Sequence, residues 1–340
     1  MNKKQICLIG LGFIAGIIAT YILGKVFKST STDTTIKQGL GVEYLVQDNL
    51  DFKYVRPLLD VEYISQDDSL AQFPYMKKIQ SDVKAEIDKY PDVKIGYYYN
   101  DLSNAGWMGV NAEENFIPAS LLKLPMLIAY YKLREDEPDL FEQQIFYNGN
   151  DFNGLRSTTE ESNITPGHIY TVRQLLEAMI IYSDNNALEL LFSYRKEALA
   201  DVFEDLKAPL PENRNDISMR DFLSPINMSK FLLVLYNGSY LRKVDSEEAL
   251  ELLTKVKYRD GIEASLPSSV IVAHKYGERK VNVGNGNSEN ELHDCGIVYW
   301  TKSPYLLCIM TRGKALDFQT ASGIIAKLSK ITYDGLTGSK

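Results

Sequence analysis

The chain has 340 residues, of which 45% are hydrophobic, and a formal charge of -8 at pH 7. It is therefore long enough to bury a core of ordinary size, and its composition is that of a globular protein. The negative charge and the lack of a long basic stretch argue against nucleic acid as a partner.

Near the start, residues 6–24 form an apolar run about long enough to cross a bilayer as a helix. Lysines stand on both sides of it, so the positive-inside rule does not set its orientation. A cleavable signal peptide is the alternative, but no small-x-small cleavage site follows directly, which favours an uncleaved anchor. The sequence then divides into a cytoplasmic tip (1–5), a transmembrane anchor (6–24), a linker with an extended arm (25–70) and a folded domain (71–335).

Within the linker, the Ser/Thr-rich residues 29–38 are typical of a flexible tether, and residues 39–70 are expected to form an arm that packs on the domain. Beyond it the patterns predict strands near both ends of the domain and helices between them. The predicted elements are a helix at 72–89, strands at 93–100 and 105–110, helices within 119–245, strands at 269–275, 295–301 and 305–311, and a helix at 318–331. This order predicts an α/β (α+β) fold in which one antiparallel sheet meets an all-helical part at a cleft.

The first motif with chemical meaning is Ser120-Leu121-Leu122-Lys123, at the start of an apolar helical run. Helical residues three apart share a face, so Lys123 is expected beside the Ser120 hydroxyl. Free N–H groups at a helix start favour a developing oxyanion, and a lysine in an apolar pocket loses its proton more easily and acts as a base. Pro125 indicates a kink or an early 3₁₀ turn. Taken alone, such a motif is more often just a serine near the start of a buried helix, with no catalytic role.

The second motif, Ser183-Asp184-Asn185, interrupts two amphipathic helical patterns, the first of which Thr171 is expected to cap. Such residues between helices are ordinarily caps. As chemistry, Ser183 would relay a proton to a leaving group and Asn185 would hold a substrate amide.

The third motif, Lys275-Tyr276-Gly277, closes an apolar, β-branched run, so Lys275 is predicted at a strand end. A lysine there would point into a cleft if that strand borders one. By itself the motif is a strand end with a charged tip.

The three histidines do not have metal-ligand spacing, so no metal site is expected. His168 is placed in a polar loop and His274 beside the third motif, while His293 opens a strand as a structural imidazole bonded to backbone, with a role near the cleft as the alternative. Cys295 and Cys308 are predicted as two buried thiols on consecutive strands, with a cross-strand disulfide as the alternative.

The order of these motifs resembles the penicillin-recognising serine hydrolases, nearest to the class A β-lactamase-like group. Two further stretches carry the resemblance, the sequence Thr-Val-Arg-Gln-Leu at 171–175 and the strand at 293–299. It covers roughly residues 71–333. The fold that it implies is β-lactamase/transpeptidase-like, with a five-stranded antiparallel sheet flanked by helices and an all-helical subdomain.

The resemblance implies a catalytic role for three residues. Ser120 would be the acylated nucleophile, Lys123 its proton partner and Ser183 a second proton-transfer group. The reaction would be acyl transfer from a β-lactam or from a D-Ala-D-Ala-type amide of a peptidoglycan stem peptide. No metal or organic cofactor enters that scheme.

The resemblance also implies substrate-binding roles. Asn185 would line the cleft, and Lys275 would attract the substrate carboxylate with Tyr276 and Gly277 beside it. The oxyanion hole would be formed by backbone N–H groups, that of the nucleophile and that of Glu278.

Two departures from the family bear on the activity. Family β-lactamases carry a Glu-x-x-Leu-Asn element whose Glu activates the deacylating water, and residues 208–216 contain no such element. Glu212 is the one candidate in this loop for activating the water, although an acidic loop residue is more often simply exposed to solvent. The second departure is Tyr276, which stands where the family has a small hydroxyl residue; its phenol would either contact the substrate carboxylate or narrow the cleft.

Two hypotheses follow. The first is a bacterial, single-pass membrane protein whose extracytoplasmic domain is a serine hydrolase, either hydrolysing β-lactams or acting as a penicillin-binding DD-peptidase. The alternative is a non-catalytic cell-wall-binding or scaffolding protein that keeps the fold.

Overall fold

The computed structural model describes residues 33–39, 42–48, 52–56, 58–60, 65–149, 163–211, 220–284, 287–300, 303–314 and 316–338. The predicted anchor at 6–24 and the loop acid Glu212 lie outside these residues. Within them, no helix combines the length and apolarity needed to span a bilayer.

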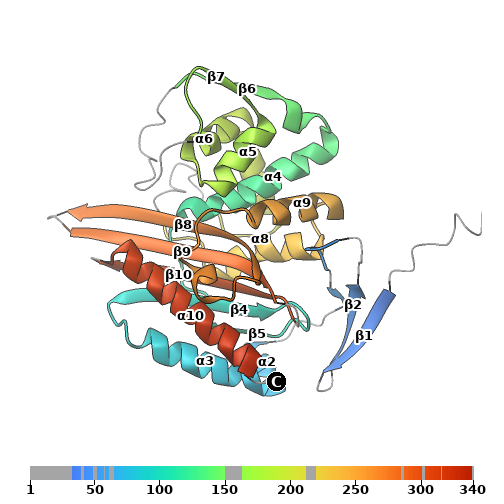
Figure 1. The fold of residues 1–340 in the computed structure, drawn as a ribbon, viewed down its shortest axis with the longest axis vertical. Coiled ribbons are helices and arrows are strands. Elements are labelled where there is room, and N and C mark those ends of the chain that lie inside the picture. The colour runs from blue at the N-terminus through green and yellow to red at the C-terminus, as the bar shows by residue number, and fades with distance from the viewer. Residues whose placement is uncertain are drawn as a thin grey trace, which may run out of the picture.

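One five-stranded antiparallel sheet forms the centre of the domain, in the strand order β5-β4-β10-β9-β8 (Figure 1). Its strands come from both ends of the domain, as the sequence predicts. They are β4 (Val93–Asp101), β5 (Trp107–Val110), β8 (Ile271–Gly284), β9 (Asn287–Tyr299) and β10 (Tyr305–Lys314). β8 is therefore an edge strand, and Figure 1 shows it beside the helical part of the domain.

Helices cover both faces of this sheet. α3 (Pro74–Ile87) and α10 (Phe318–Gly338) pack together across one face, preceded by the short α2 (Gln66–Gln72) (Figure 1). On the other face α8 (Pro225–Asn237) packs against β4, β9 and β10. The 3₁₀ turn η4 (Ile262–Ser265) lies against α10 just before β8.

The helical part is built around α4 (Lys123–Asp136), whose first nine residues are all buried. The 3₁₀ turn η1 (Ala119–Leu122) leads directly into it. Pro125 is thus in the first turn of α4, where a missing N–H leaves no hydrogen bond broken, and the predicted 3₁₀ turn is present just before it. The surrounding elements are η2 (Leu140–Glu142), α5 (Val172–Ile181), α6 (Asn185–Tyr194), α7 (Ala198–Asp205) and α9 (Lys243–Leu253).

Capping residues begin α5 and α6 at the positions predicted from the sequence. Thr171 caps α5 in a reciprocal capping box with Gln174, and the Asp184 carboxylate caps α6 by accepting from the Ala187 N–H at 2.9 Å. The capping interpretation of the second motif is therefore correct for Asp184. It leaves the neighbours of Asp184 available for other roles.

Several predicted boundaries are wrong. β8 continues to Gly284, so Lys275 lies inside a strand and not at its end, because the polar residues that follow pair with an equally polar start of β9. A two-stranded ribbon of β6 (Gln144–Tyr147) and β7 (His168–Thr171) was not predicted, and His168 opens one of its strands instead of lying in a loop.

The predicted tether also differs from the structure. A small sheet of β1 (Asp33–Gly39), β2 (Val42–Asp48) and β3 (Leu58–Asp60) lies at the side of the domain, and β1 overlaps the stretch expected to be a flexible tether (Figure 1). Between β2 and β3 the chain packs on the domain as expected. There the Glu247 carboxylate of α9 accepts the N–H groups of three consecutive residues, at 2.7 to 3.1 Å, from Lys53 to Val55.

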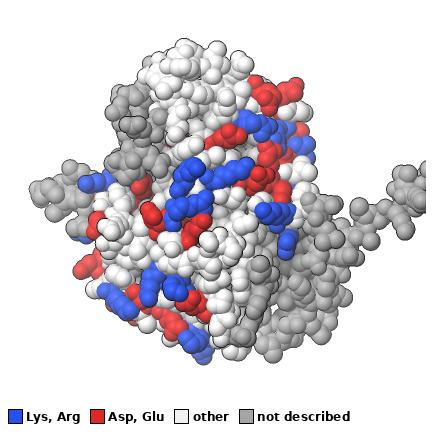
Figure 2. Space-filling view, viewed as in Figure 1, with Lys and Arg blue, Asp and Glu red and all other residues white. Residues whose placement is uncertain are grey.

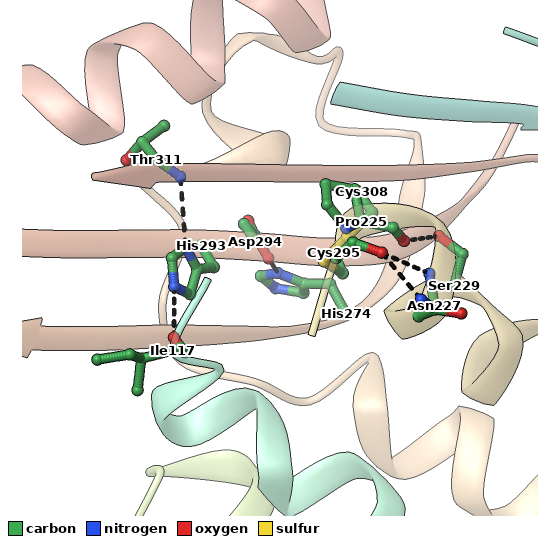
Figure 3. The surroundings of a disulfide bond; sticks show 11 residues. Ile117, Pro225, Asn227, Ser229, His274, His293, Asp294, Cys295, Cys308 and Thr311 are labelled. Carbon is green, nitrogen blue, oxygen red and sulfur yellow. Dashed lines mark hydrogen bonds and ion pairs between the residues drawn. A yellow bond between two sulfur atoms is a disulfide. The ribbon is translucent and has the colours of Figure 1, made fainter. Parts of the chain in front are cut away.

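The two strand cysteines form a disulfide, which corrects the prediction of two thiols. Cys295 of β9 pairs directly with Cys308 of β10 in the sheet register, and their sulfur atoms are bonded (Figure 3). Both side chains are fully buried. The hydrophobic pattern predicts burial but not pairing, because only the strand register brings the two residues opposite each other.

On the face shown in Figure 2, positive and negative side chains are interspersed. The helical part contains an ion-pair network, in which Arg134 contacts Asp245 and Glu248, and Arg173 also contacts Glu248. These pairs hold α4, α5 and α9 together.

Candidate active site

The Lys123 amine is the centre of the candidate site. Its Nζ lies 3.0 Å from Ser120 Oγ, 3.1 Å from Ser183 Oγ and 2.7 Å from Asn185 Oδ1, and it also contacts the backbone carbonyl of Ser183. The lysine side chain is fully buried. Residues more than sixty positions apart in the sequence therefore meet at one nitrogen atom.

Lys275 enters the same cluster from β8. Its Nζ donates to Ser183 Oγ at 2.9 Å and to the Tyr276 carbonyl at 2.9 Å, and the side chain is fully buried. Both amines thus lie within hydrogen-bonding distance of one hydroxyl. A hydroxyl accepts two hydrogen bonds and donates one, so Ser183 is arranged to exchange protons between these groups.

Two residues in left-handed backbone conformations flank the reacting groups. Ala119, immediately before Ser120, has φ 48°, and Ser183 itself has φ 59°. Such conformations are unfavourable for residues other than glycine and are common at functional sites. Here they turn the chain so that η1 and the α5–α6 junction both direct side chains at Lys123.

Gly277 allows β8 to approach the nucleophile segment. A Cβ atom at this position would lie 2.9 Å from the Pro118 carbonyl oxygen and 3.0 Å from the Leu121 nitrogen. Both are backbone atoms of η1 or of its cap, which cannot move aside without moving Ser120. The glycine of the third motif is therefore needed for close packing.

His293 supports the same segment from β9. Its Nε2 lies 2.9 Å from the Ile117 carbonyl oxygen, and its Nδ1 lies 3.3 Å from the Thr311 nitrogen (Figure 3). The N–H of Thr311 can only donate, so the ring is neutral, with its proton on Nε2. The expected role of this histidine, a structural imidazole bonded to backbone, matches these contacts, and burial lowers its pKa to about 4.

His274 belongs to a different environment. Its Nδ1 donates to Asp294 Oδ1 at 2.8 Å, and the other oxygen of that carboxylate accepts the Ile262 N–H at 2.9 Å (Figure 3). Successive strand residues point to opposite faces of a sheet, so the ring lies on the side away from Lys275. This pair anchors η4 to the sheet.

Tyr276 does not extend into open solvent. Its ring is 4% exposed, stacks on Tyr258 at 4.3 Å between centroids, and has Lys275 Nζ at 4.1 Å from its own centroid. Tyr258 is in turn hydrogen-bonded through its hydroxyl to Ser322 of α10. The two tyrosines form an aromatic wall beside the lysine, which a small hydroxyl residue would not provide.

Glu278 is the remaining predicted site residue. It follows Gly277 in β8 and is half-buried. The predicted oxyanion hole, made of the N–H groups of Ser120 and Glu278, stays a prediction. In the parts of the chain that the structure describes, no group of three or more His, Cys, Asp or Glu residues is arranged to hold a metal ion.

Sequence reasoning missed two acidic residues with shifted pKa values, one on β9 and one on α6. Glu291 of β9 is buried, its carboxylate lies 3.7 Å from Arg312, and burial raises its pKa to about 7. Glu189 of α6 is half-buried, and burial raises its pKa as well. In the sequence both resemble ordinary surface charges; the helical spacing of Glu189 from Asn185 is the one signal that pointed to it.

A sequence profile of the beta-lactamase enzyme family matches residues 78–336. The chain belongs to this family. The serine-hydrolase class expected from the three motifs is therefore confirmed at the level of the beta-lactamase family.

Individual members of the beta-lactamase family are distant in sequence. The chain is 21% identical to beta-lactamase VEB-1 of Pseudomonas aeruginosa, over 76% of this chain and 88% of that protein. Among solved structures, an acyl-enzyme complex of a PBP-A mutant with penicillin G gives a TM-score of 0.65 at 18% identity, covering 77% of this chain and 97% of the other. A representative class A β-lactamase from Bacteroides cellulosilyticus gives a TM-score of 0.67 at 17% identity, covering 78% and 99%. The expected α/β fold with an antiparallel sheet is thus that of these proteins.

Proposed function

We propose that this protein is a membrane-anchored serine hydrolase whose Ser120 is acylated by a β-lactam or by a D-Ala-D-Ala-type amide of a peptidoglycan stem peptide. In this proposal residues 6–24 are the anchor and the catalytic domain is extracytoplasmic. The observation that carries the catalytic part is the 3.0 Å contact between Ser120 Oγ and Lys123 Nζ in a buried site.

The surroundings of Lys123 leave it able to act as a base in its neutral form. Four oxygens surround its Nζ, and two of them, the Ser183 carbonyl and Asn185 Oδ1, can only accept hydrogen bonds. A neutral amine would donate its two hydrogens to these acceptors and keep its lone pair for the Ser120 hydroxyl. Burial also disfavours the charged form of a lysine. This arrangement supports removal of the Ser120 proton.

The acylation step then proceeds as follows. Ser120 Oγ forms a bond to the amide carbonyl carbon while its proton passes to Lys123 Nζ. Ser183, in reach of both amines, donates a proton to the leaving nitrogen and is reprotonated from Lys123. The C–N bond breaks, and an ester of Ser120 remains.

Substrate orientation in this proposal depends on the same cluster. Lys275 supplies positive charge for the substrate carboxylate, and Asn185, held by Lys123, presents its amide to the substrate. Tyr276, stacked on Tyr258, packs beside the Lys275 amine. The N–H groups of Ser120 and Glu278 are assigned to the oxyanion.

The decisive experiment is intact-protein mass spectrometry of the full chain during exposure to benzylpenicillin. We expect a covalent adduct in the wild type that is absent in Ser120→Ala and unchanged in Ser193→Ala, an exposed serine on α6 that serves as a matched control. Release of D-alanine from a stem pentapeptide would assign the DD-peptidase activity. Muropeptide binding with neither adduct nor D-alanine release would contradict the proposal and favour a scaffolding role.

The anchor needs a separate measurement. In bacterial cells that express the full chain, we expect it to remain in the membrane fraction after a carbonate wash and to be cleaved by protease added to spheroplasts. Recovery in the soluble fraction, or protection from external protease, would contradict this part of the proposal.

A further inference from the structure

Hydrolysis of an ester on Ser120 requires a group that removes a proton from the attacking water. The contacts of Lys123 described above are with two serine hydroxyls, a backbone carbonyl and an amide oxygen, and the buried Lys275 in turn contacts Ser183. A carboxylate that lies near this cluster, and is not already committed to a cation, would be the chemically suitable base.

α6 carries such a carboxylate. The helix begins at Asn185, whose Oδ1 contacts Lys123 Nζ at 2.7 Å, and Glu189 follows one turn later. Helical residues four apart have Cβ atoms about 5–6 Å from each other on the same face. Asn185 and Glu189 therefore share a face of α6.

This face is not the one that packs into the core. The buried side of α6 is formed by Ala187, Leu190 and Leu191. Helical geometry places Glu189 roughly on the opposite side. Despite this position, Glu189 is only partly exposed.

The direction of the side chain also favours contact with the site. Side chains in an α-helix lean toward its N-terminus, and the N-terminus of α6 is the end that meets Lys123. Among the residues that the structure describes, Glu189 has neither a hydrogen-bond partner nor an ion-pair partner. Burial raises the pKa of its carboxyl above the ordinary value, which makes it a stronger base once ionised.

We propose that Glu189 is the general base that activates the deacylating water, an assignment that rests on the proposed acylation of Ser120. The carboxylate takes one proton from water as the water oxygen bonds to the acyl carbon. The resulting tetrahedral intermediate collapses with breakage of the bond to Ser120 Oγ. The proton held by Glu189 returns to Ser120 Oγ through the Lys123 amine, so one water is consumed and both side chains are restored.

The test separates formation of the adduct from its release. Four proteins are compared: the wild type, Glu189→Gln, Glu189→Asp and the control Glu177→Gln, which changes an exposed acid on α5. Each is acylated with benzylpenicillin, freed of excess reagent and followed by intact-protein mass spectrometry. We expect Glu189→Gln to be acylated within about threefold of the wild-type rate but to release the acyl group about 100-fold more slowly. Glu189→Asp should fall between them, and the control should match the wild type.

A pH profile excludes a merely structural role. Release from the wild type should slow toward acidic pH as Glu189 becomes protonated, and release from Glu189→Gln should lack this acidic limb. Equal release rates in the wild type and Glu189→Gln, or a wild-type adduct that never leaves, would overturn the assignment while the proposed acylation stands. Failure of the wild type to form any adduct would overturn both.

Discussion

Two side chains on β9 are expected to give the stability of the protein opposing pH dependences. His293 and Glu291 are alternate residues of this strand, so they lie on the same face of the sheet, and both are almost fully buried. Each has a pKa that burial moves away from its ordinary value. Removing either one should therefore reveal the titration of the other.

The effect of His293 is loss of stability in acid. Its pKa is about 4 in the folded protein against an ordinary 6.5, because burial disfavours the charged ring. Between these values the unfolded chain binds the proton and the folded protein does not, so the free energy of unfolding falls as the pH falls from 6.5 to 4. The full difference between these two pKa values corresponds to about 3 kcal/mol in the free energy of unfolding.

Glu291 acts in the reverse direction. Its pKa is about 7 in the folded protein against an ordinary 4.5, with burial as the largest cause and Arg312 partly offsetting it. Here the folded protein keeps a proton that the unfolded chain has lost, so the free energy of unfolding falls as the pH rises from 4.5 to 7. The magnitude is again about 3 kcal/mol, and the two contributions largely cancel in the wild type.

The assay is urea unfolding at several values between pH 4.5 and 7 for the wild type, His293→Gln, Glu291→Gln and the double variant. A glutamine at 293 can still donate to the Ile117 carbonyl, and a glutamine at 291 resembles the protonated acid. Relative to the wild type, we expect His293→Gln to lose about 2 to 3 kcal/mol on going to pH 7 and Glu291→Gln to gain a similar amount. Parallel curves for all four proteins would refute the reasoning.

Three further predictions concern the packing at Gly277, the arm and the helix caps. Gly277→Ala should slow acylation by about tenfold or more, since the new Cβ would displace the nucleophile segment, whereas Gly323→Ala, with nothing within 4 Å, should leave acylation unchanged in the same mass-spectrometric assay. Glu247→Gln should lower the free energy of unfolding in urea by about 2 kcal/mol, because its charge holds three backbone N–H groups of the arm. Asp184→Ala and Thr171→Ala should each cost about 1 kcal/mol as lost helix caps, but only Asp184→Ala should also slow acylation.

The parts of the site that follow local rules could be predicted from the sequence. The contact between Ser120 and Lys123 depends only on the spacing of residues at the start of one helix. The sheet and the central helices were likewise predictable from the periodicity of apolar residues. Their order along the chain was enough to predict a sheet shared by both ends of the domain.

Other features depend on contacts between distant segments, which no local pattern specifies. The family resemblance placed Lys275 and Ser183 in one site, but their direct contact across 92 positions was not predicted. The disulfide depends on the register of β9 and β10, and the length of β8 depends on its partner strand. Glu189 resembles any charged residue on a helix until the position of Asn185 at Lys123 shows which way that face of α6 is turned.

The sheet and the helical part contribute different things to the proposed chemistry. The sheet fixes the position of the nucleophile, because β8 packs under η1 at Gly277 and β9 holds the residue before Pro118 through His293. The helical part supplies the proton-transfer groups around Lys123. A change that loosens the contact between sheet and η1 should therefore slow acylation and leave release of the acyl group less affected. A change confined to Glu189 of α6 should do the reverse, so the ratio of the two rates distinguishes these two kinds of disturbance.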